Sequence, residues 1–206
     1  MEIVVRFFQE GGAFMYPIAL VLAAGIAIAL ERFIYLQRAG LSNRRAFDEL
    51  LPLLKKQDFN SALRFTNDSS AGLATMIGSG ISRISQGSRQ DVEYAMEECL
   101  METLPRLEKR TSYIQIFASI ATLLGLLGTI IGLIAAFASV AEADPSEKAT
   151  LLSESISIAM NTTAFGLMSA IPLILIHAYL QTKTAEIVDS IEMAGVRFLN
   201  MIPNPA

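Results

Sequence analysis

Three stretches of the chain are apolar almost without interruption. They cover about residues 13 to 36, 114 to 140 and 156 to 180. A helix needs about 20 mostly apolar residues to cross a bilayer core about 30 Å thick, and each stretch approaches or exceeds that length. The second stretch carries no charged side chain, unlike a buried helix of a soluble protein. The pattern therefore predicts three transmembrane helices.

The segment between the first two spans has apolar residues at helical spacing, interrupted by break signals. It predicts three short helices, over about 44 to 58, 58 to 68 and 72 to 85. Asp58 is the expected cap of the second helix, and we expect Pro52 to bend or reset the first. No alternating pattern typical of strands competes with these helices.

A longer helix is predicted after these three, and either Ser88 or Asp91 can cap it. Its apolar stripe consists of Val92, Met96, Leu100, Leu104 and Leu107. No strong break separates this helix from the second span. We therefore expect it to run straight into the membrane with a kink at Pro105, and we expect a second kink at Pro172 in the third span.

The distribution of Lys and Arg sets the expected orientation. Of the 16 basic residues, 12 follow the strictly apolar part of the first span and precede the second, and Lys183 and Arg197 follow the third. Basic residues near membrane ends remain on the cytoplasmic side. The same bias is the reverse of that in a signal peptide, so the first span is expected to be a retained anchor. The predicted segments are periplasmic 1–12, transmembrane 13–36, cytoplasmic 37–112, transmembrane 113–140, periplasmic 141–154, transmembrane 155–181 and cytoplasmic 182–206.

Composition supports a membrane protein and narrows the function classes. Of 206 residues, 52% are hydrophobic, and the mean hydropathy is +0.46. The net charge of -4 comes with no dense basic patch, so we expect no nucleic-acid partner. Cys99 and His177 are the sole residues of their types, and no phosphate-binding loop or catalytic triad occurs. We expect no enzyme, cofactor or metal, with Cys99 in a packing role and His177 hydrogen-bonded near the inner end of the third span.

Small residues recur every three or four positions in the last two spans. The second span carries Ala118, Ala121, Gly125, Gly128, Gly132, Ala135 and Ser139, and the third carries Ser155, Ala159, Thr162, Gly166 and Ser169 or Ala170. In lipid, such residues let helices approach closely. The two spans are therefore expected to form an antiparallel hairpin packed through Gly125, Gly128, Gly132 and Gly166.

The polar residues of the spans are candidates for an ion pathway. The hydroxyls of Thr122, Thr129, Thr162 and Thr163 either bond back to a carbonyl one turn earlier or line a wet path. Asn161 has more hydrogen-bonding capacity than its own helix can satisfy, so it must face protein or water. None of these groups titrates near neutral pH, so a proton-accepting carboxylate has to come from a partner chain. Glu31, Arg32 and Glu154 lie at span ends and are expected to be interfacial or snorkelling charges.

The stretches "ATLLGLLGTIIGLIAAF" (121 to 137) and "SISIAMNTTAFGLMSAIP" (155 to 172) resemble the signature membrane helices of the MotA/TolQ/ExbB proton-channel family. The upstream "LPRLEKRTSYIQIFASIA" and "ERFIYL" are similar to that family too. The resemblance covers most of the chain, and residues 40 to 87 match only in helical character. Three spans with a modest cytoplasmic segment resemble the ExbB/TolQ branch.

The resemblance implies an all-α inner-membrane protein that works as an assembly. Family members form rings, commonly of five copies, around the membrane helices of two ExbD/TolR-like subunits whose Asp carries the proton. The motion reaches the periplasm or outer membrane through TonB- or TolA-like components. Thr129 and Thr163 match the family's lumen threonines, while position 158, commonly Glu, is Ile here. The alternative is a passive helical scaffold without ion coupling.

Overall fold

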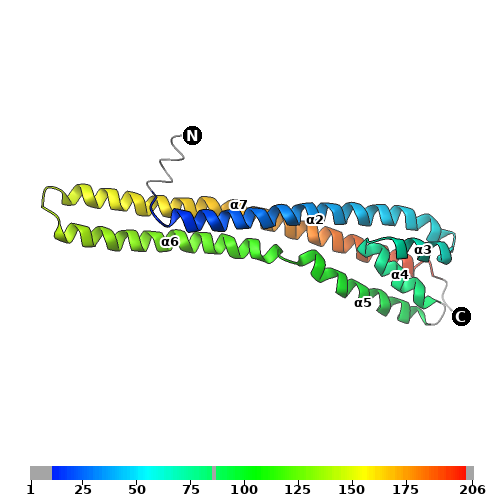
Figure 1. Cartoon of the computed structure of the whole chain (residues 1–206). Coiled ribbons are helices and arrows are strands. Elements are labelled where there is room, and N and C mark those ends of the chain that lie inside the picture. Colours follow the sequence, from blue (N-terminus) through cyan, green and yellow to red (C-terminus); the bar gives the residue numbers. More distant parts are fainter. Residues whose placement is uncertain (1–10, 85–86, 203–206) are drawn as a thin grey trace. The chain divides into compact units, whose positions relative to one another are not determined.

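The structure is a computed structural model that describes residues 11–84 and 87–202. The predicted periplasmic segment 1–12 therefore lies almost entirely outside the described residues. The helices are α2 (Met15–Lys55), α3 (Phe59–Asp68), α4 (Gly72–Ile84), α5 (Arg89–Glu108), α6 (Thr111–Glu142) and α7 (Lys148–Leu199) (Figure 1). The described part of the chain contains no strand, and it has three helical stretches long and apolar enough to cross a membrane. The predicted all-α membrane fold is confirmed.

Helix α2 is longer than either element predicted in its place. It spans 41 residues and continues from the first apolar stretch through the segment expected to be a separate helix. Pro52 lies inside it and does not reset it, because the helix continues to Lys55. The chain leaves α2 at Gln57, whose φ of 58° is in the left-handed region.

The expectation of an unbroken helix from 88 into the second span is wrong. Helix α5 ends at Glu108 and α6 starts at Thr111, with Arg110 between them at a left-handed φ of 65°. Pro105 lies within α5, and its carbonyl accepts a hydrogen bond from the Lys109 N–H at 3.0 Å. The helix is thus interrupted at Lys109, four residues after the proline. The sequence between the two helices contains no glycine or proline that would predict this interruption. Pro172 likewise lies inside the continuous helix α7.

The described chain divides into two compact units. Unit 1 comprises residues up to Glu31 together with Arg110–Ala178, and unit 2 comprises Arg32–Lys109 together with Tyr179 onward. Unit 1 thus holds the start of α2, all of α6 and the first part of α7. Unit 2 holds the remainder of α2 and α7 together with α3, α4 and α5.

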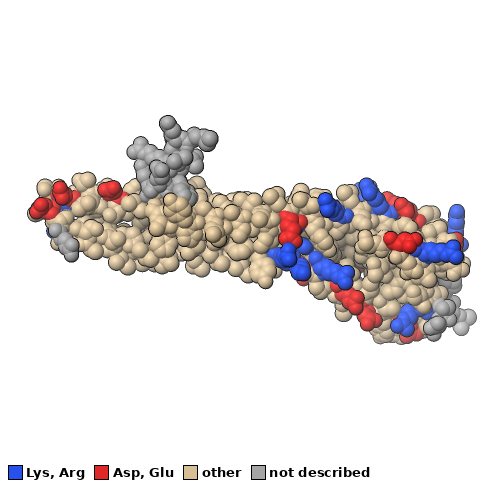
Figure 2. Space-filling view, viewed as in Figure 1, with Lys and Arg blue, Asp and Glu red and all other residues tan. Residues whose placement is uncertain are grey.

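Unit 1 packs through small residues, as the sequence predicts. Its buried positions in α6 and α7 include Ala118, Ala121, Gly125, Gly128, Ala159, Thr162, Gly166, Ser169 and Ala170. The α6 track differs from prediction at its end, because Ala135 and Ser139 are exposed and Ala136 is fully buried. Large apolar side chains point outward, and Figure 2 shows a long stretch of this unit's visible face without Lys, Arg, Asp or Glu. Such a surface suits lipid or neighbouring chains.

Unit 2 is a helical core with the predicted apolar faces inside. Its fully buried side chains include Leu50, Ile77, Ile191 and Phe198. The predicted Asp58 cap is confirmed, since its carboxylate accepts from the Ser61 N–H at 3.1 Å. Cys99 is half-buried, and burial raises the pKa of its thiol, which favours the protonated, less nucleophilic form.

The start of α5 resolves the choice between Ser88 and Asp91, because both residues cap it. Ser88 is the N-cap, and its hydroxyl accepts from the Asp91 N–H at 3.3 Å. The Asp91 carboxylate accepts from the Ser88 N–H at 2.6 Å and from the Ser88 hydroxyl at 2.8 Å, which completes a capping box.

We expect the start of α5 to loosen in acid. The Ser88 N–H, followed by its hydroxyl, lowers the pKa of Asp91, so the contribution of this cap to stability is complete above the ordinary Asp pKa. It is lost as pH falls through the lower folded-state pKa. Hydrogen exchange of the first-turn amides should therefore accelerate at low pH in the parent chain. Asp91→Asn should abolish this pH dependence, and an unchanged acid response in that variant would contradict the assignment.

Arg32 is buried, which corrects the expectation of a snorkelling charge. Only 3% of it is exposed, and its guanidinium donates to the carbonyls of Leu107 and, at 3.4 Å, Arg106. It also lies 4.6 Å from the centre of the Tyr35 ring. The carbonyls in the last turn of a helix lack partners within the helix, so Arg32 stabilises the end of α5.

Replacing Arg32 should destabilise unit 2. Arg32→Ala leaves buried carbonyls of α5 without their charged donor, which costs about 2 kcal/mol of unfolding free energy. Denaturation in mixed micelles, followed by circular dichroism, measures this difference. Arg38→Ala is the matched control, because Arg38 is an exposed arginine of the same helix. Equal stability of the two variants would show that the Arg32 contacts contribute nothing.

Candidate functional site

The backbones of α6 and α7 approach closely at two glycines, which fixes the position of the site. A Cβ atom on Gly166 would lie 2.7 Å from the Ala121 carbonyl oxygen and 3.0 Å from the Gly125 Cα. A Cβ on Gly125 would meet backbone atoms of Gly166, Thr162 and Thr163 at 3.2 to 3.3 Å. Since backbone atoms cannot rotate away, glycine is required for this approach.

The other two predicted packing glycines lie on the same face of α6. A Cβ on Gly128 would overlap the Thr162 side chain, and one on Gly132 would lie 2.9 Å from the Ala159 Cβ. All four glycines thus lie in the contact between α6 and α7. Their packing role, predicted from spacing, agrees with the places that they occupy.

Thr129 and Thr163 meet across this helix contact. Their hydroxyls are hydrogen-bonded to each other. The Thr129 hydroxyl also lies 3.2 Å from the Gly125 carbonyl and 3.3 Å from the Ala159 carbonyl, and the Thr163 hydroxyl lies 3.1 Å from the Gly125 carbonyl. Both side chains are partly exposed. Two residues 34 positions apart therefore form one hydroxyl pair.

The pair has few protons and many acceptor sites. Each hydroxyl supplies one donor and two lone pairs, and the carbonyls of Gly125 and Ala159 accept donors but offer none. The two protons are therefore taken up inside the helix pair, and lone pairs remain available. Chemically, the pair can accept a hydrogen bond from a protonated acid or water, or coordinate a cation.

Thr162 points in a different direction from Thr163. It is 2% exposed, and its hydroxyl lies 2.7 Å from the Gly11 carbonyl and 3.0 Å from the Ile158 carbonyl. The Gly11 carbonyl is presented by a turn in which Gly12 has φ of 74°, a conformation that favours glycine. Thr162 therefore ties the chain before α2 to α7 and reaches no surface of the single chain.

Asn161 and Thr122 occupy the remaining predicted positions. Asn161 is partly exposed, and its amide has no hydrogen-bond partner within residues 11–84 and 87–202. Thr122 is also partly exposed, and its hydroxyl bonds back to the Ala118 carbonyl at 3.1 Å. The structure thus brings Thr129 and Thr163 together and directs Thr162 toward Gly11, while neither Asn161 nor Thr122 is hydrogen-bonded to the pair.

In the part of the chain that the structure describes, no ionisable side chain is hydrogen-bonded to the hydroxyl pair. The Glu31 carboxylate is bound by the Arg110 guanidinium at 2.8 and 2.9 Å, with both side chains about half exposed at 49% and 47%. Glu154 lines a cavity of about 810 Å³ together with Ser153, Ser157 and Ile158. His177 is 8% exposed. Among the described residues, no group of three or more His, Cys, Asp or Glu is placed to hold a metal ion.

A family model described as the MotA/TolQ/ExbB proton channel family matches residues 68–193, well over half of the chain. The chain belongs to this family. The match covers α4 to α7 almost completely and so includes the hydroxyl pair and all four packing glycines. The ExbB-like branch is supported by individual relatives.

Two curated ExbB relatives align with nearly the whole chain, and a third aligns with part of it. An ExbB homolog of Methanothermobacter thermautotrophicus is 28% identical over 192 residues, which is 92% of this chain and 67% of the relative. An ExbB-like protein of Synechocystis is 25% identical over 91% of this chain and 74% of its own length. The biopolymer transport protein exbB1 of Vibrio cholerae is 47% identical over 53 residues, 26% of this chain and 23% of that protein. This ExbB-like chain is thus a multi-pass membrane protein of a channel and transport-energising family, which is not a family of enzymes.

Two acceptors of the ExbB-like site were missed by sequence reasoning. The carbonyl of Gly11 lies 151 positions from Thr162, and the carbonyl of Ala159 lies 30 positions from Thr129. Every residue has a backbone carbonyl, so the residue type does not indicate which carbonyl will accept a hydrogen bond from a distant side chain. The glycine pair Gly11 and Gly12 was the available signal for the first of them.

Proposed function

We propose that this chain is the ring-forming subunit of an ion-driven motor in the bacterial inner membrane. In this proposal five copies surround the membrane helices of an ExbD/TolR-like dimer. Proton flow through the assembly does mechanical work on the periplasm or outer membrane through a TonB- or TolA-like component. The N-terminus is periplasmic and the C-terminus cytoplasmic, which is supported by the 12 basic residues that follow the strictly apolar part of the first span and precede the second.

The hydroxyl pair of Thr129 and Thr163 is the observation that carries the proposal. One of its two protons forms the bond between the hydroxyls and the other is within reach of a carbonyl of the helix contact, so lone pairs remain for a group placed against the pair. A partner's carboxylic acid is such a group in its protonated form, since it donates one hydrogen bond. In its ionised form it has no proton to donate, and the contact is lost. The pair therefore distinguishes the two protonation states of a carboxylate that this chain does not itself supply.

Position 158 agrees with a carboxylate supplied from outside. The family commonly has Glu there, and in this chain Ile158 is 36% exposed beside Gly12. Asn161 lies one turn further along α7 and supplies uncharged donors and acceptors. We place Thr129, Thr163, Asn161 and Thr122 along the ion pathway. Thr162 supports it from behind, through its bond to Gly11.

The membrane potential supplies enough energy for small rotations. One charge crossing 100 mV releases about 2.3 kcal/mol. In a ring of identical copies, neighbouring positions of the inner helices are nearly equivalent. A step between them therefore needs little work once the central acid has changed its charge. Apolar walls with a few hydroxyls make the free energy of the charged acid much higher than that of the neutral acid.

Co-expression with a candidate ExbD-like chain tests the proposal. We expect the two chains to copurify in detergent as a closed ring, with five copies of this chain by native mass spectrometry. Vesicles containing the complex should show ion flux that depends on both chains. Recovery of monomers alone, without the partner, would overturn the proposal.

A passive scaffold is the second candidate. One observation favours it, since the hydroxyls of Thr122, Thr129 and Thr162 all lie within hydrogen-bond distance of carbonyls one turn earlier in their own helices. In a scaffold these hydroxyls only pack helices, and their removal leaves ion-dependent activity intact. The motor proposal makes the opposite prediction for Thr163.

A further inference from the structure

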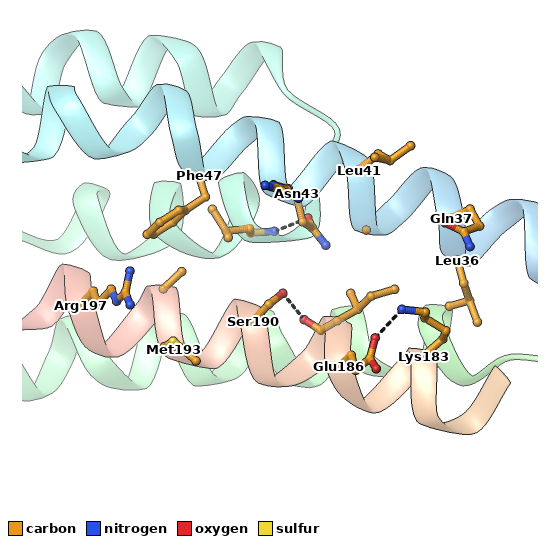
Figure 3. A pocket seen from close by; sticks show the side chains of 15 residues that line it. Leu36, Gln37, Leu41, Asn43, Phe47, Lys183, Glu186, Ser190, Met193 and Arg197 are labelled. Atoms are coloured by element: carbon orange, nitrogen blue, oxygen red, sulfur yellow. Dashed lines mark hydrogen bonds and ion pairs between the residues drawn. The ribbon is translucent and has the colours of Figure 1, made fainter. Parts of the chain in front are cut away.

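Unit 2 contains a groove between α2 and α7 that the ion pathway does not use. It has a volume of about 430 Å³, and its apolar lining includes Leu41, Phe47, Ile187 and Met193 (Figure 3). Leu41 and Met193 are each 55% exposed. An apolar lining that remains open to solvent is typical of a surface that another protein covers.

The groove carries a net positive charge at its rim. Arg44, Lys183 and Arg197 line it against one acid, Glu186, which is bound to Lys183 at 2.5 Å. Arg197 lies over the Phe47 ring, with its guanidinium carbon 5.7 Å from the ring centre. Three cations and one carboxylate leave two positive charges beside the apolar lining. The groove is thus complementary to an acidic surface with apolar side chains at its centre.

Helix α5 presents such a surface on its outer face. Tyr94 and Met101 are 59% and 72% exposed, seven positions apart on the side opposite the buried Val92 and Met96. Three acids, Glu97, Glu98 and Glu102, flank these two side chains and are all exposed. The spacing of i, i+3, i+4, i+7 and i+8 places all five on one side of the helix. Tyrosine and methionine are enriched at the centres of protein interfaces.

We propose that the α5 outer face of one copy docks into the α2 and α7 groove of the next copy. Helix α5 contributes no residue to the groove, so a single chain presents both surfaces at once. A contact between two different surfaces is head-to-tail, and repeating it closes a ring when the rotation per copy is right. This inference rests on the proposed ring and names the contact that orders its subunits.

The dimensions of the two surfaces agree. Tyr94 and Met101 are about 10 Å apart along the helix axis at 1.5 Å per residue, and Leu41 and Phe47 are about 9 Å apart. The groove accepts protruding side chains, and the helix that carries them lies across its opening. Amphipathic helices dock into grooves through anchors at i, i+3, i+4 and i+7 in this way.

Cysteine cross-linking between two differently tagged copies tests this contact in the full complex. Cys99 is the only cysteine, so Cys99→Ser provides the background. One copy carries Met101→Cys and the other Leu41→Cys, and a short thiol cross-linker should join the two tags. The control pairs Met101→Cys with Asp48→Cys, since Asp48 is exposed on α2 but does not line the groove.

We expect the first pair to give a cross-linked heterodimer and the control pair to give little. A complex that forms a ring without this cross-link overturns the inference and leaves the proposed function intact. Failure to form any ring overturns both. A third outcome is that the cross-link is absent and an anionic lipid copurifies with the complex. If the double variant Arg44→Glu with Arg197→Glu then loses this lipid, the inference is overturned and the groove is a lipid site.

Charge exchange provides a second, independent arm. Reversing Glu97, Glu98 and Glu102 to Lys on the Met101→Cys copy should reduce the cross-link yield about tenfold, because like charges then face each other. Pairing that copy with one carrying Arg44→Glu and Arg197→Glu should restore the yield. A yield that is insensitive to both changes contradicts docking through these charges.

Discussion

Thr163→Val should abolish most ion-driven activity and leave the assembly intact. Valine has nearly the shape of threonine, so the helix contact at Gly125 and Gly166 is retained. The variant lacks the hydroxyl that bonds to Thr129 and to the Gly125 carbonyl. Removing one partner of a buried hydrogen bond costs about 1 to 3 kcal/mol, so ion flux should fall about 5- to 150-fold.

Flux into vesicles that hold the complex with its partner measures this effect, with ring content checked by native mass spectrometry. Thr163→Ser should recover most of the flux, because it restores the hydroxyl. Ser119→Ala is the matched control, since the Ser119 hydroxyl is exposed on α6 and, among the described residues, bonds only to the Gln115 carbonyl of its own helix. Normal flux in Thr163→Val would support the passive scaffold instead.

Gly166→Val should prevent stable packing of α6 against α7. Even a single Cβ at this position lies 2.7 Å from the Ala121 carbonyl oxygen, so the two backbones must separate. Overpacking of this kind costs about 1 to 3 kcal/mol or more, and separation also breaks the Thr129 and Thr163 pair. We expect a large drop in the yield of folded protein and no recoverable ring.

Thermal aggregation of the detergent-solubilised chain measures the loss of stability. Gly40→Ala is the matched control, because a Cβ there meets the Ile187 side chain at an ordinary 3.7 to 3.8 Å. Alanine is also the better helix former, so that variant should equal or exceed the parent in stability. If Gly166→Val were as stable as Gly40→Ala, the close approach of the two helices would be wrong.

Much of unit 1 follows from the sequence because small residues carry a direct physical signal. Glycines at 125, 128 and 132 in α6 and at 166 in α7 predict a helix contact. In the structure they lie against Gly166, Thr162, Ala159 and Gly125 respectively. The register drifts at the end of α6, where Ala136 rather than Ala135 is buried. A spacing of three and a spacing of four are equally compatible with one helix face over a single turn, so sequence alone does not choose between them.

The junctions between elements were less predictable, because they depend on contacts between distant residues. Pro105 and Pro52 suggested a kink and a reset, but the chain breaks at Arg110 and continues through Pro52. The sequence around Arg110 carries no break signal. Arg32 has the pattern of an interfacial charge, yet it is buried against carbonyls about 75 positions away. The residue type shows that a buried guanidinium needs hydrogen-bond acceptors, but it does not identify them.

For the polar residues 161 to 163, the sequence predicts that protein or water contacts are needed, but it does not predict the partner of each side chain. Composition established that three consecutive polar residues in a span cannot all face lipid. The structure separates them, with Thr162 bonded to Gly11, Thr163 bonded to Thr129 and Asn161 on a third, partly exposed side. The acceptor in the turn before α2 could not be anticipated from α7 alone.

An electron cryo-microscopy map of the complex with its ExbD-like partner tests the central claim most directly. The account predicts a ring of this chain with Thr129, Thr163 and Asn161 around a central cavity, and with helices of the partner inside it, their acid within reach of the hydroxyl pair. Threonine and asparagine side chains that face the surrounding detergent or lipid would contradict it. A closed assembly with no space for foreign helices would contradict it equally.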